Sequence, residues 1–319
     1  MKTIKIGVIG PGSICHRFIK GAQMIKDVEV YAIAGRNKER AEKVALQYKI
    51  PYHGLIDDLI MDTNIDAVYV CTPNESHYEI VKKCLLNGKH VLCEKPMFST
   101  IEELDEMYQL AYSKNLVLME AMKALFLPLT MKVKQLMESG RLGTILYMDG
   151  KYSYKSDLAM DHWAYHPVSG GGMRDVGVYP LGYFNYLANS PIQEIVTMAR
   201  SAQTGVDAFC QALVRYENGM ISSNTGGLDL QTENKAMIYG TKGCIEIVNF
   251  WKASEAIVTI DGERKVMKAE MLSDFKYETE HFVECIRKGV KESPIIGYNE
   301  CLEIMKVYKE KDEKMASNC

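Results

Sequence analysis

The sequence predicts an α/β protein of two domains. Residues 1–121 are expected to form a parallel, doubly wound sheet, and residues 122–319 an α+β domain with an open, largely antiparallel sheet. Strand-like and helix-like segments alternate through the first part, which is the pattern of parallel strands joined by right-handed crossovers. Beyond it, longer strand-like segments follow one another directly, as in an antiparallel sheet. A length of 319 residues suits two domains.

The first domain is predicted from five apolar runs separated by helical segments. Helical apolar periodicity covers Lys38–Tyr48, Ser76–Asn87 and Ile101–Ser113. The motif Thr100-Ile-Glu-Glu matches a capping box, so the third of these helices is expected to begin just after Thr100. The runs expected to be strands are Ile4–Ile9, Val28–Ala34, Ala67–Cys71, His90–Cys93 and Val117–Met119.

The second domain is predicted from a helix, a series of strands and two closing helices. A glycine-rich segment, SGGGMRDVGVYPLGYF (residues 169–184), predicts a buried helix with Asp175 and Tyr179 on one face. Asn218-Gly219 predicts a hairpin turn. No flexible linker marks the boundary near residue 121, so we expect the domains to pack around a cleft. The further helices are expected over Leu129–Ser139, Tyr277–Lys288 and Asn299–Asp312, and the strands over Thr144–Tyr152, Ile192–Ser201, Ala208–Tyr216, Met220–Asn224, Lys235–Tyr239, Cys244–Phe250 and Ala256–Ile260.

Composition excludes several classes of function. With 47% hydrophobic and 25% charged residues, the chain has the make-up of a soluble globular protein. A net charge of -3 and a pI near 6.2 provide no basic field for nucleic acid or an acidic membrane. No segment has the roughly 18 uninterrupted apolar residues of a membrane span, and the N-terminal run is expected to be a strand, not a signal peptide. The nine cysteines lack Cys-x-x-Cys spacing, which predicts reduced thiols and a cytoplasmic location, with no metal site or disulfide framework.

A glycine turn follows the first strand, in the segment IKIGVIGPGSICHRF. Gly10-x-Gly12 permits a tight turn and lets the backbone approach a pyrophosphate, whose charge would lie at the N-terminus of the next helix. Cys15 replaces the usual third glycine and is small enough for close helix–strand packing. The motif alone also fits a simple βα turn, but its place in a βαβ unit of about 30 residues favours a dinucleotide site.

The end of the second strand indicates which dinucleotide is preferred. A site for NAD usually has an acidic residue here that binds the ribose 2′-hydroxyl. This chain has Gly35 and Arg36, with Arg40 nearby, and a guanidinium group pairs with a 2′-phosphate and stacks on adenine. We therefore expect NADP, with NAD as the alternative cofactor. A solvated basic helix start would also explain these arginines, although a helix N-terminus is unfavourable for cations.

Two loops follow later strands at the edge of the sheet where ligands bind. CTPNESH covers residues 71–77 and CEKPM residues 93–97. The ligand crevice of an open parallel sheet lies at these carboxyl ends. Thr72, Asn74 and His77 also suit ordinary turn and cap positions. Lys95 lies between an acid and a proline after a buried strand, which favours a functional role over that of a plain surface lysine.

Taken together, GxGxI in the first turn, TPNESH, EKP and GGGMRDVGVY resemble the Gfo/Idh/MocA oxidoreductases over essentially the whole chain. EAM…F…P (120–128), NFW (249–251), KGVKESPII (288–296) and YNECLEIMKVY (298–308) are similar to its branch of dihydrodiol and xylose dehydrogenases, close to glucose–fructose oxidoreductase. The resemblance implies a Rossmann domain, a small-molecule substrate and a homodimer or homotetramer formed through the second sheet. With the arginines above, the expected cofactor contacts are Gly10, Gly12, Ser13, Ile14, Arg36, Arg40, Thr72, Pro73, Asn74, His77, Glu94 and Lys95.

The resemblance also implies a catalytic set of Lys95, Asp175 and Tyr179. Tyr179 stands where many members have histidine, and Gly182 where they have a later aspartate. Oxidation of a secondary alcohol requires a base within reach of the hydroxyl, and Lys95 with the oxidised nicotinamide would lower the tyrosine pKa from its ordinary value of about 10. Asp175 would bind substrate or Lys95, and the glycines before it would leave room for cofactor and substrate. A buried tyrosine satisfied by a local acid is the alternative.

Three residues are candidates for substrate contacts. Where the branch has tryptophan and arginine, this chain has Lys123 and Leu125, which argues against an aromatic pocket and favours a polar sugar or a substrate with an acidic group. Trp163, in the polar and aromatic segment from Asp161 to His166, and Trp251 are expected to line the substrate. Packing within a loop or the core is the alternative for both.

Three functions fit these residues. The first is an NADP-dependent dehydrogenase of a sugar, a cyclic polyol or a dihydrodiol. The second uses the hydride step transiently, in a redox elimination that cleaves a glycoside and leaves a tightly bound cofactor unchanged. The third is a non-catalytic nucleotide-binding regulator. It is disfavoured because Lys95, Asp175 and Tyr179 form an acid–base set that a sensor does not need, and because the chain has no basic patch for DNA.

Overall fold

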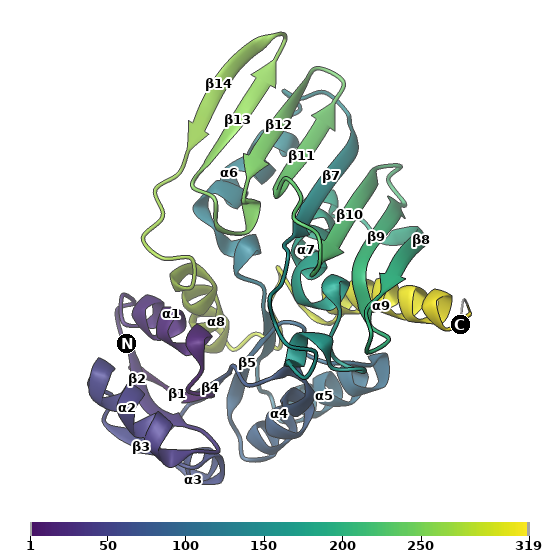
Figure 1. The fold of residues 1–319 in the computed structure, drawn as a ribbon. Helices are drawn as coiled ribbons and strands as arrows, with labels where there is room; N and C mark the ends of the chain where they lie inside the picture. Colours follow the sequence, from purple (N-terminus) through teal and green to yellow (C-terminus); the bar gives the residue numbers. More distant parts are fainter. Residues whose placement is uncertain (1, 318–319) are drawn as a thin grey trace. The chain divides into compact units, whose positions relative to one another are not determined.

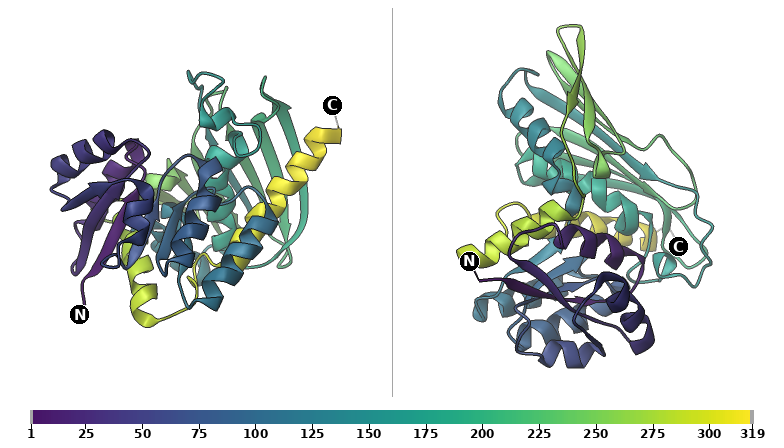
Figure 2. Two further views of the ribbon diagram at one scale, coloured as in Figure 1. Left: turned by 90° about the horizontal axis from the view of Figure 1, so that it is seen from below. Right: turned by 90° about the vertical axis from the view of Figure 1, so that its left-hand side faces the viewer.

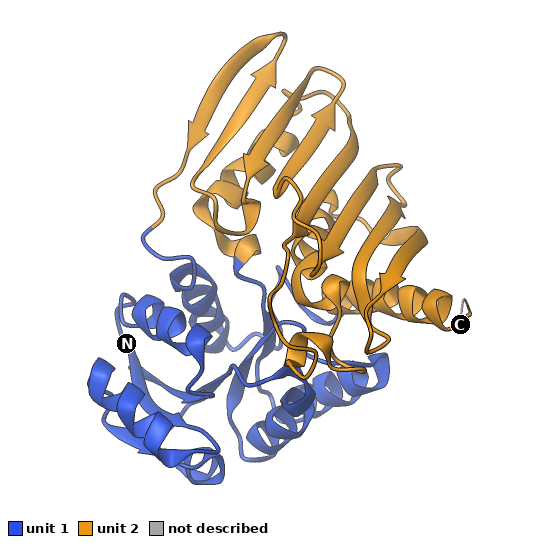
Figure 3. Ribbon diagram, in the orientation of Figure 1, with its two compact units in different colours: residues 1–123, 272–298 blue, residues 124–271, 299–319 orange. Residues whose placement is uncertain are grey.

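The computed structural model describes residues 2–317, so Cys319 lies outside the described residues. The chain divides into two compact units (Figure 3): residues 1–123 with 272–298 form unit 1, and residues 124–271 with 299–319 form unit 2. Residues 272–298 thus belong with unit 1, whereas the sequence predicts one continuous second domain from residue 122. The reason is close packing of α8 (Lys276–Lys288) on α1 (Ser13–Ala22). A Cβ at Gly21 would lie 2.8 Å from the backbone nitrogen of Lys276, and Arg17 pairs with Asp274.

Unit 1 contains a parallel sheet of six strands within the described residues, in the order β3-β2-β1-β4-β5-β6 (Figure 1). The order reverses between β1 and β4, which is the switch point where open α/β sheets bind ligands. β4 is buried along its whole length, as expected for a strand covered on both faces. The strands are β1 (Ile4–Ile9), β2 (Val28–Ala34), β3 (Tyr52–Gly54), β4 (Ala67–Val70), β5 (His90–Glu94) and β6 (Leu118–Ala121).

Local sequence signals begin the helices of unit 1. The hydroxyl of Thr100 accepts the backbone N–H of Glu103 at 3.2 Å, and the Glu103 carboxylate accepts the N–H of Ser99 at 2.9 Å, so the predicted cap is confirmed. Besides α1 and α8, the helices are α2 (Lys38–Tyr48), α3 (Ile56–Met61), α4 (His77–Leu86) and α5 (Ile101–Ser113).

Unit 2 contains a sheet of eight strands among the described residues, in the order β14-β13-β12-β11-β7-β10-β9-β8. The pairings are antiparallel except for β7 with β10, which run parallel. Asn218 and Gly219 form the predicted hairpin turn between β9 and β10, with Gly219 at φ 86°. The strands are β7 (Ile145–Ser153), β8 (Ile192–Ser201), β9 (Asp207–Tyr216), β10 (Ile221–Gly227), β11 (Lys235–Gly240), β12 (Gly243–Val248), β13 (Glu255–Ile260) and β14 (Glu263–Lys268).

Helices α6 (Pro128–Glu138), α7 (Val178–Ala188) and α9 (Tyr298–Ser317) lie on one face of this sheet (Figure 2). Tyr216 of β9 donates a hydrogen bond to Asn185 of α7 at 2.8 Å, and Thr197 of β8 donates one to Glu310 of α9. The opposite face carries no helix among residues 124–271 and 299–317. Its exposed apolar side chains are Tyr147, Val196, Met198, Leu213, Ile221, Tyr239 and Val248.

The predicted fold class is confirmed, and the elements that the sequence did not predict are either short or exposed at a sheet edge. β3 has three residues and α3 has six, which is too short for an apolar period to show. β14 has the sequence ERKVMK and is mostly exposed, because it is an edge strand. Within residues 2–317, every helix is too short or too polar to span a bilayer. The cysteines of this described part are free thiols.

Glu278 of α8 is a buried carboxyl group without a hydrogen-bond partner among the described residues. Burial raises its pKa well above the ordinary value, and the nearby Glu94 raises it further, while Lys123 opposes the increase. An unpaired carboxylate in this position would be costly, so we expect Glu278 to be protonated.

Substitution of Glu278 by glutamine keeps the side-chain shape and removes the titration. Because the folded-state pKa is raised, the stability associated with protonated Glu278 is fully present below the unfolded pKa, about 4.3, and is lost as the pH rises through the folded value. We therefore expect the unfolding free energy of the wild type, relative to Glu278→Gln, to fall as the pH rises above about 4.3, the ordinary pKa of glutamate in the unfolded chain. The fall amounts to about 1.4 kcal/mol for each tenfold change in proton affinity.

Urea unfolding of both proteins at a series of pH values measures this difference. Glu280→Gln is the matched control, because Glu280 is exposed on the same helix. A difference between wild type and Glu278→Gln that does not vary with pH would contradict the assignment.

Candidate active site

The turn after β1 brings two backbone segments into contact. Gly10 has φ 117°, and a Cβ there would lie 2.6 Å from the carbonyl oxygen of Cys71 at the end of β4. Helix α1 begins at Ser13 with Gly12 as its N-cap, and its first turn contains no acidic residue. The positive end of the helix dipole is therefore not neutralised by a side chain, which suits an anionic ligand such as a pyrophosphate. Cys15 is fully buried, as the predicted close packing requires.

A cavity of about 540 Å³ opens at the carboxyl ends of β1, β2 and β4. Six predicted cofactor residues line it, namely Gly10, Gly12, Arg36, Arg40, Thr72 and Pro73. Ser13 and Ile14 are the first residues of α1, next to this lining. The other lining residues are Pro11, Gly35, Asn37, Ile56, Cys71, Glu75, Ser76 and Ile80. Two glycines in the turn, a helix N-terminus without an acidic residue in its first turn, and two guanidinium groups together fit a dinucleotide, whose phosphates are anionic.

Arg36 and Arg40 lie just after β2, at the start of α2. Both are exposed, and both line the cavity. The side chain of Asn37 accepts the backbone N–H of Arg40 at 3.0 Å and so caps α2. Gly35 is needed because a Cβ there would lie 2.6 Å from the ring of Pro11. Many NAD-binding sites have an acidic residue at the end of β2. This chain instead has Gly35, which packs against Pro11 in the first turn, followed by Arg36, which lines the cavity.

His77 joins the two loops, at residues 71–77 and 93–97, that were predicted to contact the cofactor. Its ring is fully buried, and its two nitrogens lie 2.9 Å from the Thr72 carbonyl oxygen and 3.1 Å from that of Pro96. Burial lowers the pKa of His77, which favours the neutral ring. The structure therefore gives His77 contacts to both loops, and any effect on a cofactor would act through them. Asn74 is buried in the short helical turn Asn74–Ser76 beside it.

Glu94 and Lys95 lie at the end of β5. The phenol of Tyr69 donates to Glu94 at 2.5 Å, and the backbone N–H of Lys95 donates to the other carboxylate oxygen at 3.3 Å. Burial raises the pKa of Glu94, while the Tyr69 hydrogen bond and the charges of Lys95 and Lys123 oppose it. Glu94 thus fixes the backbone at Lys95. Neither residue is part of the cavity lining above.

Lys123 is already paired within unit 1. Its side chain is only 5% exposed, its ammonium group forms an ion pair with Asp274, and it lies 5.0 Å from the ring centre of Phe275. Burial lowers the pKa of Lys123, and Asp274 opposes this effect. The expectation that Lys123 attracts an acidic substrate group is therefore not supported, because the carboxylate of Asp274 already neutralises its charge. The sequence gives no sign of this partner, which lies 151 positions away.

The segment around Asp175 is a π-helix, Met173–Gly177, that continues directly into α7. The expectation of one α-helical turn between Asp175 and Tyr179 therefore needs correction, because a π-turn is wider and four residues fall short of a full turn. Asp175 is buried, and it accepts a hydrogen bond from the phenol of Tyr154 at 3.1 Å. Burial raises the pKa of Tyr154, and the Asp175 charge raises it further, so this phenol remains a donor.

Aromatic rings surround the half-buried Tyr179. Tyr152 stacks on Trp251 with ring centres 3.6 Å apart and planes 9° from parallel. The Tyr179 ring lies 5.7 Å from Tyr152 and 6.5 Å from Trp251, and Tyr152 lies 6.5 Å from Tyr154. Trp251 thus lies beside Tyr179, but it is only 6% exposed and packs on Tyr152, so its contact with substrate stays a prediction and core packing the alternative. Sequence reasoning missed Tyr152 and Tyr154. The two tyrosines are two positions apart at the end of a predicted strand, and this spacing places both side chains on the same face of the strand.

The glycines before Asp175 provide contact between backbone segments, not the free space predicted from the sequence. A Cβ at Gly172 would lie 2.9 Å from Gly227 Cα, and one at Gly171 would lie 2.2 Å from a carboxylate oxygen of Asp207. A Cβ at Gly170 would meet the backbone of Ala164 and His166. These positions are therefore filled by protein atoms.

Trp163 lies in the short helix Trp163–Tyr165 and packs beside a small apolar cluster. The cluster consists of Ala164, Tyr165, Val206 and Leu228. The ring of His162 lies 5.2 Å from that of Trp163. These contacts favour loop packing for Trp163, the alternative considered for it above.

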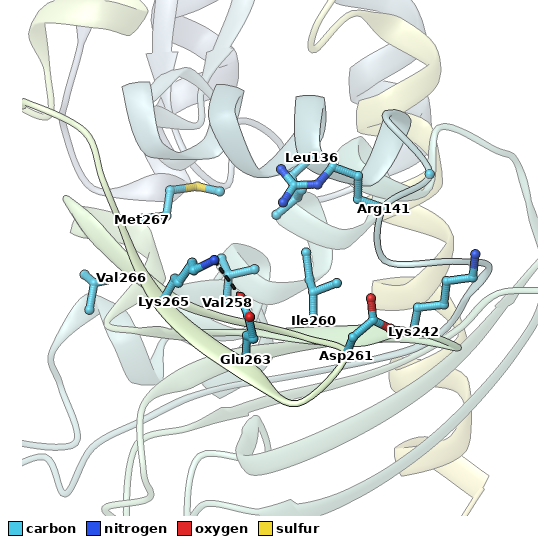
Figure 4. A pocket seen from close by; sticks show the side chains of 11 residues that line it. Leu136, Arg141, Lys242, Val258, Ile260, Asp261, Glu263, Lys265, Val266 and Met267 are labelled. Carbon is cyan, nitrogen blue, oxygen red and sulfur yellow. Dashed lines mark hydrogen bonds and ion pairs between the residues drawn. The ribbon is translucent and has the colours of Figure 1, made fainter.

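A larger cavity, of about 650 Å³, lies in unit 2 between the end of α6 and the β13–β14 hairpin (Figure 4). Leu136, Ile260 and Met267 give it apolar walls, and its charges are mixed, with Arg141 and Glu263 among them. It contains none of the predicted catalytic or cofactor residues. We therefore assign the chemistry to the residues described above.

Family models and known relatives match both parts of the chain. Residues 4–122 match an oxidoreductase family with an NAD-binding Rossmann fold, and residues 130–246 match the GFO/IDH/MocA C-terminal domain. The chain is 31% identical to trans-1,2-dihydrobenzene-1,2-diol dehydrogenase of Mus musculus over 312 residues, covering 92% of this chain and 91% of the relative. It is 32% identical to the protein of the same name from Macaca fascicularis over 311 residues, with the same coverage.

Solved structures share the fold. A 3-ketoreductase from Actinomadura kijaniata, in complex with NADP and TDP-benzene, has a TM-score of 0.88, 22% identity and coverage of 97% of both chains. Aldose-aldose oxidoreductase from Caulobacter crescentus has a TM-score of 0.89 and 20% identity, covering 99% of this chain and 98% of that one. The predicted family is confirmed: the chain belongs to the Gfo/Idh/MocA oxidoreductases and is an NAD(P)-dependent enzyme of that family.

Proposed function

We propose that the enzyme transfers a hydride between NADP and a secondary alcohol or carbonyl group of a sugar, a cyclic polyol or a dihydrodiol. The observation that carries this proposal is the cavity at the switch point of the parallel sheet, lined by Gly10, Gly12 and Arg36. The relatives named as dihydrodiol dehydrogenases support an alcohol on a ring as the substrate class. The stacked rings of Tyr152 and Trp251 beside Tyr179 also suit the face of a cyclic molecule.

In this proposal Tyr179 is the acid–base group. A bound nicotinamide would supply hydride transfer from or to the carbinol carbon, depending on the direction of the reaction. The phenolate of Tyr179 takes the hydroxyl proton during oxidation, and the phenol gives it back during reduction. A tyrosine has an ordinary pKa of about 10, so a cation near the phenolate favours the reactive form. The proposal therefore requires Lys95 and Tyr179 to contact one substrate.

Asp175 has an orienting role in the same proposal. Its carboxylate accepts a hydrogen bond from the phenol of Tyr154. Burial raises the pKa of Tyr154, so this phenol stays protonated and does not act as a second base for the substrate hydroxyl. Asp175 then presents its remaining hydrogen-bonding capacity to the substrate or to the Lys95 ammonium.

The preference for NADP over NAD rests on the arginines after β2. Arg36 and Arg40 line the cavity where an NAD enzyme usually has a carboxylate for the ribose 2′-hydroxyl. Guanidinium groups supply bidentate hydrogen bonds to a 2′-phosphate, and an acid in their place would repel it.

We also propose a homodimer or homotetramer formed through the helix-free face of the unit 2 sheet, and a cytoplasmic location. The face carries several exposed apolar side chains, with Met198 at 81% exposure. Contiguous apolar surface of this kind marks interaction sites. Free cysteines in the described residues are compatible with a reducing compartment.

The first test is a substrate screen followed by replacement of Tyr179. A panel of sugars, cyclic polyols and dihydrodiols is assayed with NADP by the absorbance of the reduced cofactor. With the alcohol that turns over fastest, Tyr179→Phe should lower kcat by at least about 100-fold, the low end for acid–base catalysis, with NADPH binding retained.

Tyr186→Phe is the matched control, since Tyr186 lies on the same helix and its hydroxyl contacts Met131. Full activity of Tyr179→Phe would exclude the acid–base role. A silent panel with a copurifying, non-exchanging cofactor would instead favour transient redox chemistry.

Cofactor preference is tested by Arg36→Ala. Loss of a charge-assisted contact to the 2′-phosphate should raise the KM for NADP by about 10-fold or more, with little change for NAD. Initial rates with each cofactor measure the ratio, and Lys38→Ala is the control because Lys38 is a nearby cation outside the cavity lining. An equal effect on both cofactors would exclude a specific 2′-phosphate contact.

Assembly is tested by Met198→Glu. A charge within the proposed apolar contact would be unpaired and desolvated, so the oligomer should dissociate toward monomers. Light scattering coupled to size-exclusion chromatography measures the mass. Leu46→Glu, which alters an exposed leucine of α2, is the control and should leave the mass unchanged. An unaltered oligomer in Met198→Glu would place the interface elsewhere.

A further inference from the structure

Four charged side chains gather around the start of the π-helix Met173–Gly177. Lys311 of α9 donates to one carboxylate oxygen of Asp207 at 2.7 Å and lies 2.8 Å from Asp312. Arg174, inside the π-helix, binds Asp312 through both terminal nitrogens, at 2.7 Å and 3.2 Å. Two cations and two anions from three elements thus form a network of balanced charge.

The second oxygen of Asp207 binds the backbone of the π-helix. It accepts the N–H of Met173 at 2.6 Å. The first N–H groups of a helix have no acceptor within the helix, so Asp207 supplies from β9 what an N-cap residue normally supplies locally. Asp207 is fully buried and Lys311 is 1% exposed. Both groups are therefore shielded from water, where charge-assisted hydrogen bonds are strong.

Asp207 also contacts the residue that anchors Asp175. The backbone N–H of Asp175 donates to the carbonyl of Gly171 at 2.8 Å. Gly171 has φ 107°, and a Cβ on it would lie 2.2 Å from an oxygen of Asp207. The same carboxylate thus holds the amide of Met173 and packs against the turn that accepts the amide of Asp175.

A buried ion pair is a poor means of adding stability, because desolvation of the charges offsets their attraction. A role that better explains such pairs is the selection of one conformation over another. π-Helices are rare and occur frequently at functional sites. Here the buried pair lies at the first residue of a π-helix that contains Asp175. In this position the pair can favour the π-helical backbone over an α-helical one.

We propose that Asp207 and Lys311 are positioning residues for Asp175: they hold the start of the π-helix and thereby fix where the Asp175 side chain points. The catalytic part of this inference rests on the proposed function, in which Asp175 orients the substrate or Lys95. The structural part, that the buried pair holds the π-helix, does not depend on the reaction.

The test uses the double variant Asp207→Asn/Lys311→Met in the full chain. It removes both buried charges together and keeps a neutral acceptor for Met173, so no unpaired charge remains to prevent folding. Hydrogen–deuterium exchange of the peptide covering residues 171–177 reports the π-helix directly. Replacing a charged acceptor by a neutral one should accelerate exchange there by at least about fivefold. Unchanged exchange would overturn the structural part.

Turnover then tests the link to Asp175, with the panel alcohol that reacts fastest. The double variant should lower kcat by about 10-fold or more, with NADPH affinity unchanged, and should add no further loss in an Asp175→Asn background. Independent, multiplicative losses would overturn the link. Full turnover of Asp175→Asn alone would instead reject the proposed role of Asp175, while the exchange data still decide the structural part. Asp229→Asn, at the surface ion pair with Arg200, is the control.

Discussion

Close approach of backbone segments at positions without a side chain determines where the functional groups lie. In unit 1, a Cβ at Gly10 would lie 2.6 Å from the carbonyl oxygen of Cys71, and this close approach shapes the turn at the proposed cofactor cavity. In unit 2, a Cβ at Gly226 of β10 would lie 2.5 Å from the carbonyl oxygen of Gly172 and 2.7 Å from Gly177 Cα. A side chain at Gly10 or Gly226 would force apart the segments that carry the proposed cofactor and substrate contacts.

Electrostatics in the interior follows from the same close packing. Two buried lysines are paired with carboxylates, Lys123 with Asp274 and Lys311 with Asp207, whereas the buried Lys89 donates to the backbone carbonyls of Asp62 and Ile65. Glu278 has no hydrogen-bond partner among residues 2–317. Its pKa is raised, which favours the protonated, uncharged form, so this carboxyl group can be buried without pairing with a cation. The exposed Arg36 and Arg40 at the cavity are different, because their charge remains available to a ligand. This contrast separates cations that hold the fold from cations that suit the cofactor.

The sequence predicts the elements of unit 1 well because strands buried on both faces, such as β1 and β2, are nearly continuous apolar runs with glycine or polar ends. The sequence also indicates several residues that line the cavity after β1, β2 and β4, because the turn chemistry there is local; their contacts with a cofactor stay a prediction. It does not predict the π-helix, since the letters MRDVG fit an α-helix equally well and the difference is made by Asp207 and Gly226 from distant strands. The return of α8 to unit 1 and the pairing of Lys123 with Asp274 are nonlocal in the same way.

The central claim is that a hydride passes directly between a carbinol carbon and the nicotinamide. The most direct measurement uses the preferred alcohol of the panel with deuterium at the carbinol carbon, followed by mass analysis of the reduced cofactor. The account predicts one deuterium in each NADPH formed, with none released to water, and a lower rate with the labelled alcohol wherever the transfer step limits turnover. Reduced cofactor without deuterium, or label recovered in the solvent, would contradict it.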